Sequence, residues 1–431
     1  MGVALTFRPS GDLRRRGPRT GNVGPVMTRT DDILAKAVDG GRLTPAEGLA
    51  LFENADLAEL GAAAHAVRMR LNPEPVVSYI IDRNVNYSNI CDSYCAFCSF
   101  YAPPGSKRGY LLSKPTLARK IEETKSLGGF QVLMQGGTHP EWDVAWYADL
   151  IAFVKSHGIH VHALSAPEIQ AIAKASKLPV RETIARLREA GLDSIPGGGA
   201  EILTDFARNA ISPMKCSTEQ WLEVHREAHA LGMRTTATMM FGHRERLADR
   251  VEHYERIRAL QDEALARVAE TGATLRGGDA GFTAFICWTF QPTNSMKRME
   301  PAGGAEYLRT LAIARLYVQN VRHFQSSWVT MGPKVGQMAL WFGCDDMGST
   351  MIEENVVSSA GVSYRMTSPE LGAVIRAAGF RPQQRNFFYE PVEAKYLDAP
   401  DRVREVVGAN PRNEALSDAA FVHEHAEAAV R

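Results

Sequence analysis

The sequence has no excess of charge of either sign, because 49 Lys and Arg residues balance 49 Asp and Glu residues. A nucleic acid or an anionic membrane surface would require a basic excess, so neither is an expected partner. No apolar run approaches the roughly 20 residues of a membrane span. The N-terminus lacks the apolar stretch of a signal peptide, since M-G-V-A-L-T-F soon meets R-P-S-G-D-L-R-R-R. Six cysteines are too few for a disulfide scaffold in a chain of 431 residues. We therefore expect a cytoplasmic protein with reduced thiols.

Composition and periodicity divide the chain into four expected segments. Residues 1–27 are rich in Arg, Gly and Pro without apolar periodicity, which predicts a disordered leader. Residues 28–74 carry helical patterning, as in T-P-A-E-G-L-A-L-F-E, and predict a helical prelude. Residues 75–365 alternate strand-like and helical runs. Residues 366–431 open with a capped helical pattern and are expected to form a helical C-terminal extension.

The alternating segment predicts the fold. Its strand-like runs are residues 78–87, 130–135, 160–165, 194–199, 234–241, 282–290, 324–330 and 349–356. Strands that alternate with helices indicate βα units and parallel pairing. Eight such strands predict an α/β protein with a (β/α)8 barrel, whose chemistry gathers at the carboxyl ends of the strands. Polar or glycine-rich clusters follow five of the strands, among them Q-G-G-T-H-P, P-G-G-G-A-E and Q-P-T-N.

Cys91, Cys95 and Cys98 form a C-x3-C-x2-C pattern directly after the first expected strand. Thiolates are suited to zinc or to iron–sulfur clusters. A structural zinc site needs four ligands, and no second cysteine pair follows, although His139 or His162 could supply the fourth. Three thiolates on a four-iron cubane instead leave one iron open to a cofactor such as S-adenosylmethionine. From the residues alone, a zinc-stabilised barrel acting as a scaffold remains the alternative.

The cysteine pattern also carries a family resemblance. With Phe97 before the last cysteine, C-x3-C-x-aromatic-C resembles the signature of the radical S-adenosylmethionine superfamily. R-N-V-N-Y-S-N-I-C, H-A-L-S-A-P-E-I and S-T-M-I-E-E-N-V-V resemble the enzymes of futalosine-dependent menaquinone biosynthesis and the deazaflavin-forming FO synthases. Within that group, P-G-G-G-A-E, T-A-T-M-M-F-G-H and W-T-F-Q-P are similar to dehypoxanthine futalosine cyclases. The resemblance covers about residues 75–385.

The resemblance implies a reaction. A 4Fe-4S cluster on the three cysteines and S-adenosylmethionine would generate a 5′-deoxyadenosyl radical, with the priming electron from reduced flavodoxin or ferredoxin. The radical would abstract the C4′ hydrogen of dehypoxanthine futalosine, and the carbon radical would close onto the carboxyphenyl ring. Loss of one proton and one electron would then give the cyclic product. Aminofutalosine synthase and an FO synthase subunit share cluster and barrel, and they are the alternative functions.

The expected cofactor-binding residues fall in the loops after the strands. Phe97 is placed to contact the adenine, and Gln135, Gly136 and Gly137 leave a strand end where backbone groups can meet the methionine moiety. A core aromatic and a plain strand-to-helix turn are the structural alternatives. Glu201 is a candidate for the methionine amino group or a ribose hydroxyl. Arg208 or Lys215 could pair with the methionine carboxylate.

Ring closure needs a proton acceptor, and a histidine or carboxylate near a strand end could serve. The candidate acceptors are Glu168, His243, Glu353 and Glu354. The candidate hydrogen-bonding partners of the substrate are Ser165, Gln291 and Asn294. Each of these residues has an ordinary structural reading as well, and the sequence predicts neither the acceptor nor the oligomeric state.

Two residues depart from the pattern of the group. Cys287 stands where proline is expected, inside the sixth strand. Asp345 stands where asparagine is expected, and we expect it near a substrate loop. The stretch between Gln261 and Gly281 is longer than usual and is expected to lie at the barrel end away from the chemistry.

Overall fold

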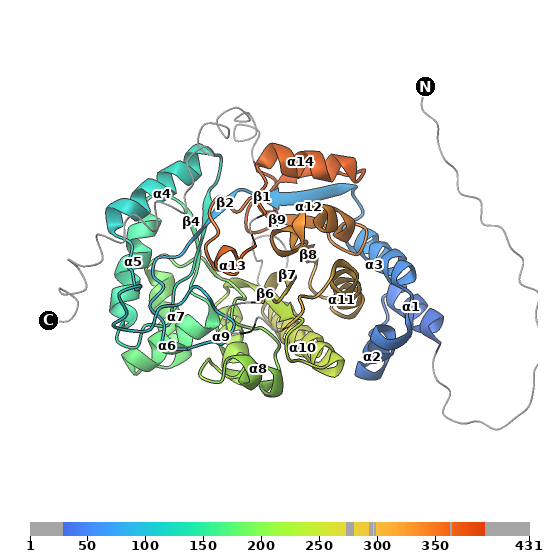
Figure 1. The fold of residues 1–431 in the computed structure, drawn as a ribbon, viewed down its shortest axis with the longest axis horizontal. Coiled ribbons are helices and arrows are strands. Elements are labelled where there is room, and N and C mark those ends of the chain that lie inside the picture. The colour runs from blue at the N-terminus through green and yellow to red at the C-terminus, as the bar shows by residue number, and fades with distance from the viewer. Residues whose placement is uncertain (1–28, 273–279, 293–295, 297–298, 363, 393–431) are drawn as a thin grey trace, which may run out of the picture.

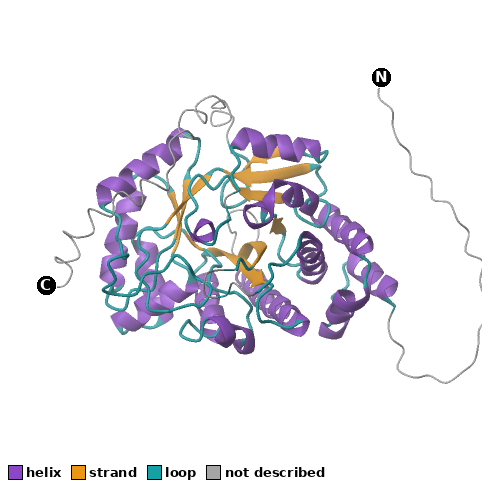
Figure 2. Ribbon diagram, in the orientation of Figure 1, coloured by secondary structure: helices purple, strands orange, loops and turns teal. Residues whose placement is uncertain are grey.

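The computed structural model describes residues 29–272, 280–292, 296, 299–362 and 364–392. They form an α/β structure in which helices surround a curled parallel sheet (Figure 1). The strands lie at the centre and the helices lie outside them (Figure 2). None of the helices in the described ranges is long and apolar enough to cross a bilayer. The expected leader, 1–27, lies outside these ranges.

The sheet has ten strands in the order β10-β1-β9-β8-β7-β6-β5-β4-β3-β2, and all of its pairs are parallel. The strands are β1 (Val76–Ile80), β2 (Asp82–Val85), β3 (Gln131–Met134), β4 (His160–Ala163), β5 (Ser194–Ile195), β6 (Arg234–Phe241), β7 (Phe282–Thr289), β8 (His323–Gln325), β9 (Asp346–Ser349) and β10 (Arg381–Gln384). Buried apolar residues between the sheet and the helices form the core.

The sheet closes on itself through its first strand, which is interrupted at Ile81. The part before the interruption, β1, pairs with β9, and the part after it, β2, pairs with β3. The backbone N–H of Thr350 donates to the carbonyl of Ile80 (3.0 Å), and that of Ile352 donates to the carbonyl of Asp82 (3.3 Å). Eight strand positions therefore complete a ring, which confirms the predicted (β/α)8 barrel, and β10 is added outside it.

Fourteen helices are present in the described residues. They are α1 (Thr30–Val38), α2 (Pro45–Asn54), α3 (Leu57–Leu71), α4 (Lys114–Ser126), α5 (Val144–Ser156), α6 (Ala166–Ser176), α7 (Val180–Glu189), α8 (Asp205–Ile211), α9 (Thr218–Ala230), α10 (Leu247–Thr271), α11 (Gly304–Tyr317), α12 (Trp328–Ala339), α13 (Val356–Ser359) and α14 (Ser368–Ala377). Polar N-caps begin many of them, with capping boxes from Thr44, Ser217 and Thr367. The segment expected to be a helical prelude contains α1 to α3, which pack against α10 and α11.

Two expected strands and one expected helical segment need correction. Strand seven was expected over 324–330, but β8 ends at Gln325 because α12 begins at Trp328. Strand eight was expected over 349–356, but β9 ends where that range begins, and 350–355 form a loop that leads into α13. The C-terminal segment was expected to form a helical extension, yet α14 is followed by the strand β10. Its sequence R-P-Q-Q contains a proline, which an edge strand tolerates because one side needs no ladder hydrogen bond.

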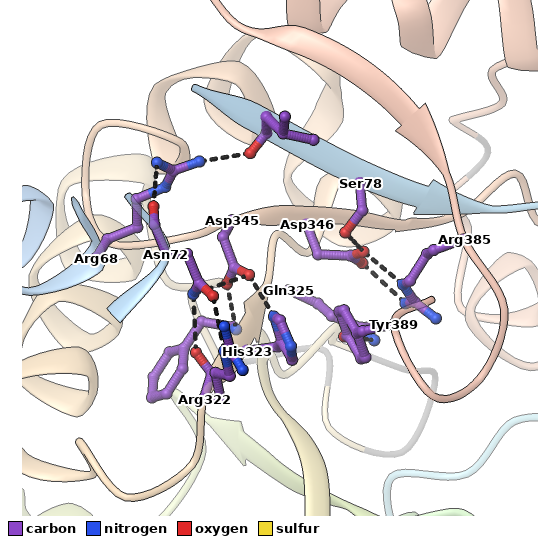
Figure 3. A network of polar contacts seen from close by, with 12 residues as sticks. Arg68, Asn72, Ser78, Arg322, His323, Gln325, Asp345, Asp346, Arg385 and Tyr389 are labelled. Atoms are coloured by element: carbon purple, nitrogen blue, oxygen red, sulfur yellow. Dashed lines mark hydrogen bonds and ion pairs between the residues drawn. The ribbon is translucent and has the colours of Figure 1, made fainter. Parts of the chain in front are cut away.

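The chain after β10 closes the amino-terminal end of the barrel. Phe387 stacks on His160 (ring centroids 4.9 Å apart), and Tyr389 stacks on His323 (3.7 Å). Arg385 donates two hydrogen bonds to Asp346 (2.6 and 3.0 Å), as Figure 3 shows. His160, His323 and Asp346 begin β4, β8 and β9, so these contacts lie where the parallel strands start. We call residues 385–389 the floor segment.

The structure also places the two unusual residues. Asp345 accepts hydrogen bonds from the backbone of Phe324 (2.8 Å) and the amide of Asn72 (3.2 Å), and it pairs with His323 (2.5 Å; Figure 3). It therefore lies at the start of β9, and the expectation that it lies near a substrate loop is wrong. Cys287 lies fully buried within the regular strand β7, and burial raises its pKa to about 12.

Candidate active site

A cavity of about 440 Å³ runs from the carboxyl ends of the strands into the barrel. Its wall includes the cysteine loop at one end and Arg385, Phe387 and Tyr389 of the floor segment at the other. Most barrels of this type fill their interior with layers of branched apolar side chains. Here polar side chains such as Asp82, Asn84 and Gln131 line the interior, so the cavity can reach the floor.

The three cysteines lie in one loop after β2, and all three line the cavity. Backbone hydrogen bonds fix this loop to its neighbours. The N–H of Cys91 donates to Ala102 (2.9 Å), and the N–H of Ala96 donates to Ile211 at the end of α8 (2.9 Å). The Cys91 sulfur also lies 3.2 Å from the Thr138 hydroxyl, in the loop after β3. The loop is thus held from both sides.

The electrostatics of the thiols suit a bound cationic group. Burial, together with the smaller effects of Glu201, Cys98 and Cys91, raises the pKa of Cys95 to about 12 against a lowering effect of Lys215. Burial likewise raises the pKa of Cys98. The buried Cys95 and the partly buried Cys98 are therefore poor thiolates alone, and ligated iron would supply the charge that stabilises them. The donor set thus fits an iron–sulfur cluster.

A single zinc ion fits less well. Within the described ranges, no three His, Cys, Asp or Glu side chains converge on one point that a metal ion could occupy. The thiolates on a cubane bind separate irons and need not converge in that way. The two histidines considered as a fourth ligand have other partners. His139 stacks on Trp142 (3.9 Å), and His162 shares a hydrogen bond with Ser194 (2.8 Å).

Glu201 and Lys215 form a buried ion pair on the cavity wall. Burial opposes ionisation of Glu201, but the charges of Lys215 and Arg208 outweigh it and hold the pKa below its usual range. Burial also opposes the Lys215 charge, and the Glu201 carboxylate outweighs it and raises that pKa. The Lys215 ammonium lies 5.4 Å from the centre of the Phe97 ring, which also lines the cavity. A carboxylate, a cation and an aromatic face therefore lie together beside the cysteines.

Arg208 lies behind this group and does not line the cavity. Its guanidinium donates to the carbonyls of Gly199 (2.9 Å), Ala200 and Cys216. Arg208 is almost fully buried. It thus holds the P-G-G-G-A-E loop in place, and Lys215 is the cation that faces the cavity.

Glu168 joins three loops at the mouth of the barrel. One carboxylate oxygen accepts from the Tyr87 hydroxyl (2.7 Å) and the Gly136 N–H (2.8 Å). The other accepts from the N–H (2.8 Å) and hydroxyl (2.6 Å) of Ser165. Burial raises the pKa of Glu168, although these donors partly offset the effect. The four sites at which a carboxylate accepts are occupied, so Glu168 is built to hold the loops.

Some of the other expected cofactor-binding residues line the cavity, and others only support the loops around it. Gln135 and Gly136 line the cavity, but Gly137 does not. A Cβ atom at Gly137 would lie 2.0 Å from the carbonyl oxygen of Ile90, so glycine is required there for the close approach of the cysteine loop. A Cβ atom at Gly136 would meet the Tyr87 ring at 2.4 Å.

The remaining candidates are placed as follows. Glu354 lines the cavity, and its carboxylate accepts the N–H groups of Val356 and Val357 (both 2.8 Å) at the start of α13. His243 is not on the cavity wall, and its ring nitrogens contact neighbouring backbone. Ser165 and Gln291 both line the cavity, where Gln291 donates to the Thr289 hydroxyl (2.9 Å). Asn294 lies outside the described residues.

The sequence analysis missed the polar lining of the barrel. Asp82, Asn84 and Asn86 occur at every second position of the first strand, a spacing that puts side chains on one face. The polar lining could therefore have been predicted from this alternate spacing in the sequence. Arg385 could not be found in this way, because it enters the cavity from the floor segment.

The chain matches two family models. Residues 85–257 match the radical SAM superfamily, and residues 279–397 match the CofH/MqnC C-terminal region. The chain is 43% identical to a cyclic dehypoxanthine futalosine synthase of Halalkalibacterium halodurans, over 84% of this chain and 94% of that one. It is 44% identical to the protein of the same name from Streptomyces coelicolor (89% and 94%). It is 36% identical to an aminodeoxyfutalosine synthase of Thermus thermophilus (84% and 95%).

Among solved structures, the chain resembles the FeFe-hydrogenase maturase HydG from Carboxydothermus hydrogenoformans. The TM-score is 0.63 at 14% identity, and the match covers 88% of this chain and 86% of that one. Methylornithine synthase (PylB) gives a TM-score of 0.61 at 16% identity, over 81% of this chain and 97% of that one. At such low identity these likenesses support the fold alone.

Proposed function

Because the chain belongs to the radical SAM superfamily, in the family that contains the cyclic dehypoxanthine futalosine synthases, we propose that it cyclises dehypoxanthine futalosine in menaquinone biosynthesis. The observation that carries this proposal is the loop of three cysteines on the wall of a cavity that is long enough to continue into the barrel. The identity of 43–44% to two proteins of that name selects this reaction within the superfamily.

Cys91, Cys95 and Cys98 would hold a 4Fe-4S cluster. A bound cluster with S-adenosylmethionine would supply the radical chemistry for removal of the ribose C4′ hydrogen. Phe97 would contact the adenine. The ionised Glu201 would accept a hydrogen bond from the methionine amino group, and Lys215 would keep that carboxylate charged and oriented.

Ring closure releases a proton, and the contacts of the four candidate acceptors differ. Glu353 is buried away from the cavity wall and pairs with Arg83 (2.8 Å) and Lys120 (2.7 Å). Glu168 has its accepting sites occupied and would act as a positioning residue for the loops. His243 is absent from the cavity wall. Glu354 also accepts three backbone N–H groups, but its half-buried carboxylate lies on the cavity wall, so we assign it the role of proton acceptor. Ser165 and Gln291 would contact the substrate.

A reduced flavodoxin or ferredoxin would supply the priming electron. The loop that carries the cysteines reaches the surface, since Tyr94 and Ala96 are both exposed between the outer cysteines. A protein donor can therefore approach the cysteine loop without entering the cavity.

The test is an anaerobic assay of reconstituted protein with S-adenosylmethionine, reductant and one substrate at a time. The substrates are dehypoxanthine futalosine and those of aminodeoxyfutalosine synthase and of the FO synthase subunit. We expect 5′-deoxyadenosine and a coupled product from dehypoxanthine futalosine, and neither from a Cys98→Ala variant. Aminodeoxyfutalosine synthase is the alternative, given the 36% identity to a protein of that name. A coupled product from a sister substrate alone would overturn the cyclase assignment.

A further inference from the structure

The first strand of the barrel presents polar side chains to the cavity at alternate positions. Asp82, Asn84 and Asn86 line the cavity and are each at most 5% exposed. Arg83 points the other way and donates to Glu123 on α4 (2.7 Å). β3 pairs with β2 in a register that places Gln131, also on the cavity wall, beside Asp82. The wall below the mouth is therefore a row of carboxylate and amide groups.

Two oxygen atoms in this row have no hydrogen-bond partner among the described residues. They are Oδ1 of Asn84 and Oε1 of Gln131. The Gln131 amide is held in one orientation, because its Nε2 donates to Asp82 (2.8 Å), whose other oxygen accepts from the Ser349 hydroxyl. The Oε1 atom of Gln131 is thus presented as an acceptor. Two threonine hydroxyls of the wall are paired instead: that of Thr236 accepts from the Gly197 N–H (2.9 Å), and that of Thr283 donates to Thr235 (3.2 Å).

Buried acceptors without partners define the ligand group that suits them. A group with an O–H or N–H donor would satisfy both oxygens, whereas a carboxylate has no proton to donate and would be repelled. The Asp82 carboxyl beside Gln131 adds to that repulsion. Under the proposed function, the ribose hydroxyls are donors and the carboxyphenyl group is not.

We propose that Asn84 and Gln131 form a subsite that accepts hydrogen bonds from the ribose hydroxyls of the substrate. The ribose then points into the barrel, and the carboxyphenyl group points toward the mouth. This inference rests on the proposed function. S-adenosylmethionine also carries ribose hydroxyls, so the experiment must separate the two ligands.

The experiment measures dissociation constants by calorimetry on the anaerobic, cluster-loaded protein without reductant, so that no turnover occurs. The ligands are dehypoxanthine futalosine, its 2′-deoxy and 3′-deoxy analogues in the presence of S-adenosylmethionine, and S-adenosylmethionine alone. The variant is Asn84→Leu, which removes the acceptor at nearly constant volume. The matched control is Thr283→Val, which removes a cavity hydroxyl that is already bonded to protein.

We expect Asn84→Leu to weaken substrate binding about tenfold, the effect of one net hydrogen bond. At least one deoxy analogue should bind the wild-type protein about tenfold more weakly than the substrate, and the variant should bind that analogue and the substrate alike. Thr283→Val should bind the substrate as the wild-type protein does.

Three results would overturn the subsite. The first is a wild-type protein that binds both deoxy analogues as tightly as the substrate, a measurement that does not depend on folding of the variant. The second is that the losses of affinity caused by the deoxy analogue and by Asn84→Leu simply add. The third is that Asn84→Leu binds S-adenosylmethionine alone more weakly than the wild-type protein does, which would show that the subsite binds the cofactor. Failure of the proposed function is a separate result, in which the wild-type protein does not bind dehypoxanthine futalosine.

Discussion

The ion pair between Arg385 and Asp346 should be one of the most sensitive positions for stability, since it ties the floor segment to the barrel (Figure 3). The two side chains are 3% and 0% exposed, and two hydrogen bonds join them. Burial lowers the pKa of Arg385, but Asp346 outweighs this effect and holds it above its usual range, so the guanidinium stays charged. Asp346→Asn would leave that charge buried without its counter-charge. Removing one partner of such a pair costs about 3–5 kcal/mol.

The assay is urea unfolding followed by circular dichroism, and the measured quantity is the change in the free energy of unfolding. A double-mutant cycle with Arg385→Met isolates the pair, and the double variant should lose less than the sum of the single variants. Glu182→Gln is the matched control, because Glu182 pairs with Arg186 on the surface of α7 at 45% and 50% exposure. Such a surface pair contributes only about 0.5 kcal/mol. If Asp346→Asn lowered the free energy of unfolding no more than Glu182→Gln does, the Arg385–Asp346 pair would have to be hydrated. The floor segment would then not exclude water from the pair.

Three other variants test separate parts of the site. Cys95→Ala should retain the fold but lose most bound iron and the brown absorbance near 400 nm, measured after anaerobic reconstitution; full iron content would contradict the cysteine assignment. Glu168→Gln should destabilise the protein by about 1.5–3 kcal/mol in urea unfolding, because a charged acceptor is lost; an unchanged midpoint would show that the loops do not need it. Burial raises the pKa of Asp82, so its contribution to stability is fully present below the unfolded value of 3.8 and is lost as pH rises through the folded value. Asp82→Asn should remove that pH dependence, and an unaltered slope in urea titrations across the acidic range would contradict the assignment.

The sequence predicted the barrel because its signals are local. Strand-like runs of six to ten residues recur between capped helices, and six of the eight expected strands contain a strand of the structure. The misplaced end of strand eight and the unexpected β10 depend instead on tertiary contacts. R-P-Q-Q has no apolar alternation, and it is a strand only because β1 offers a free edge beside it.

The cysteine loop was predictable for a similar reason, since the spacing of three thiols is itself the signal. The roles of single charged residues were harder to foresee. Arg208 and Lys215 are seven positions apart on either side of the end of α8, and nothing in their local sequence shows that one supports a loop while the other faces the cavity. That distinction depends on which carbonyl groups and which carboxylate the fold brings to each side chain.

The row of polar residues that begins on β2 is a case in which the sequence alone does not predict which face of a strand lines the cavity. In D-R-N-V-N, the residues at 82, 84 and 86 share one face and the charged Arg83 lies on the other, so both faces of the strand carry polar groups. A period of two separates the faces but does not show which one meets the cavity. The orientation of the strand is determined by Glu353, which lies 270 positions after Arg83 in the chain. Outside the barrel, its carboxylate accepts hydrogen bonds from Arg83 (2.8 Å) and from Lys120 (2.7 Å). Because those charges neutralise one another among the helices, the amides are left to face the interior, where Oδ1 of Asn84 and Oε1 of Gln131 have no partner among the described residues and can be satisfied only by a ligand or water.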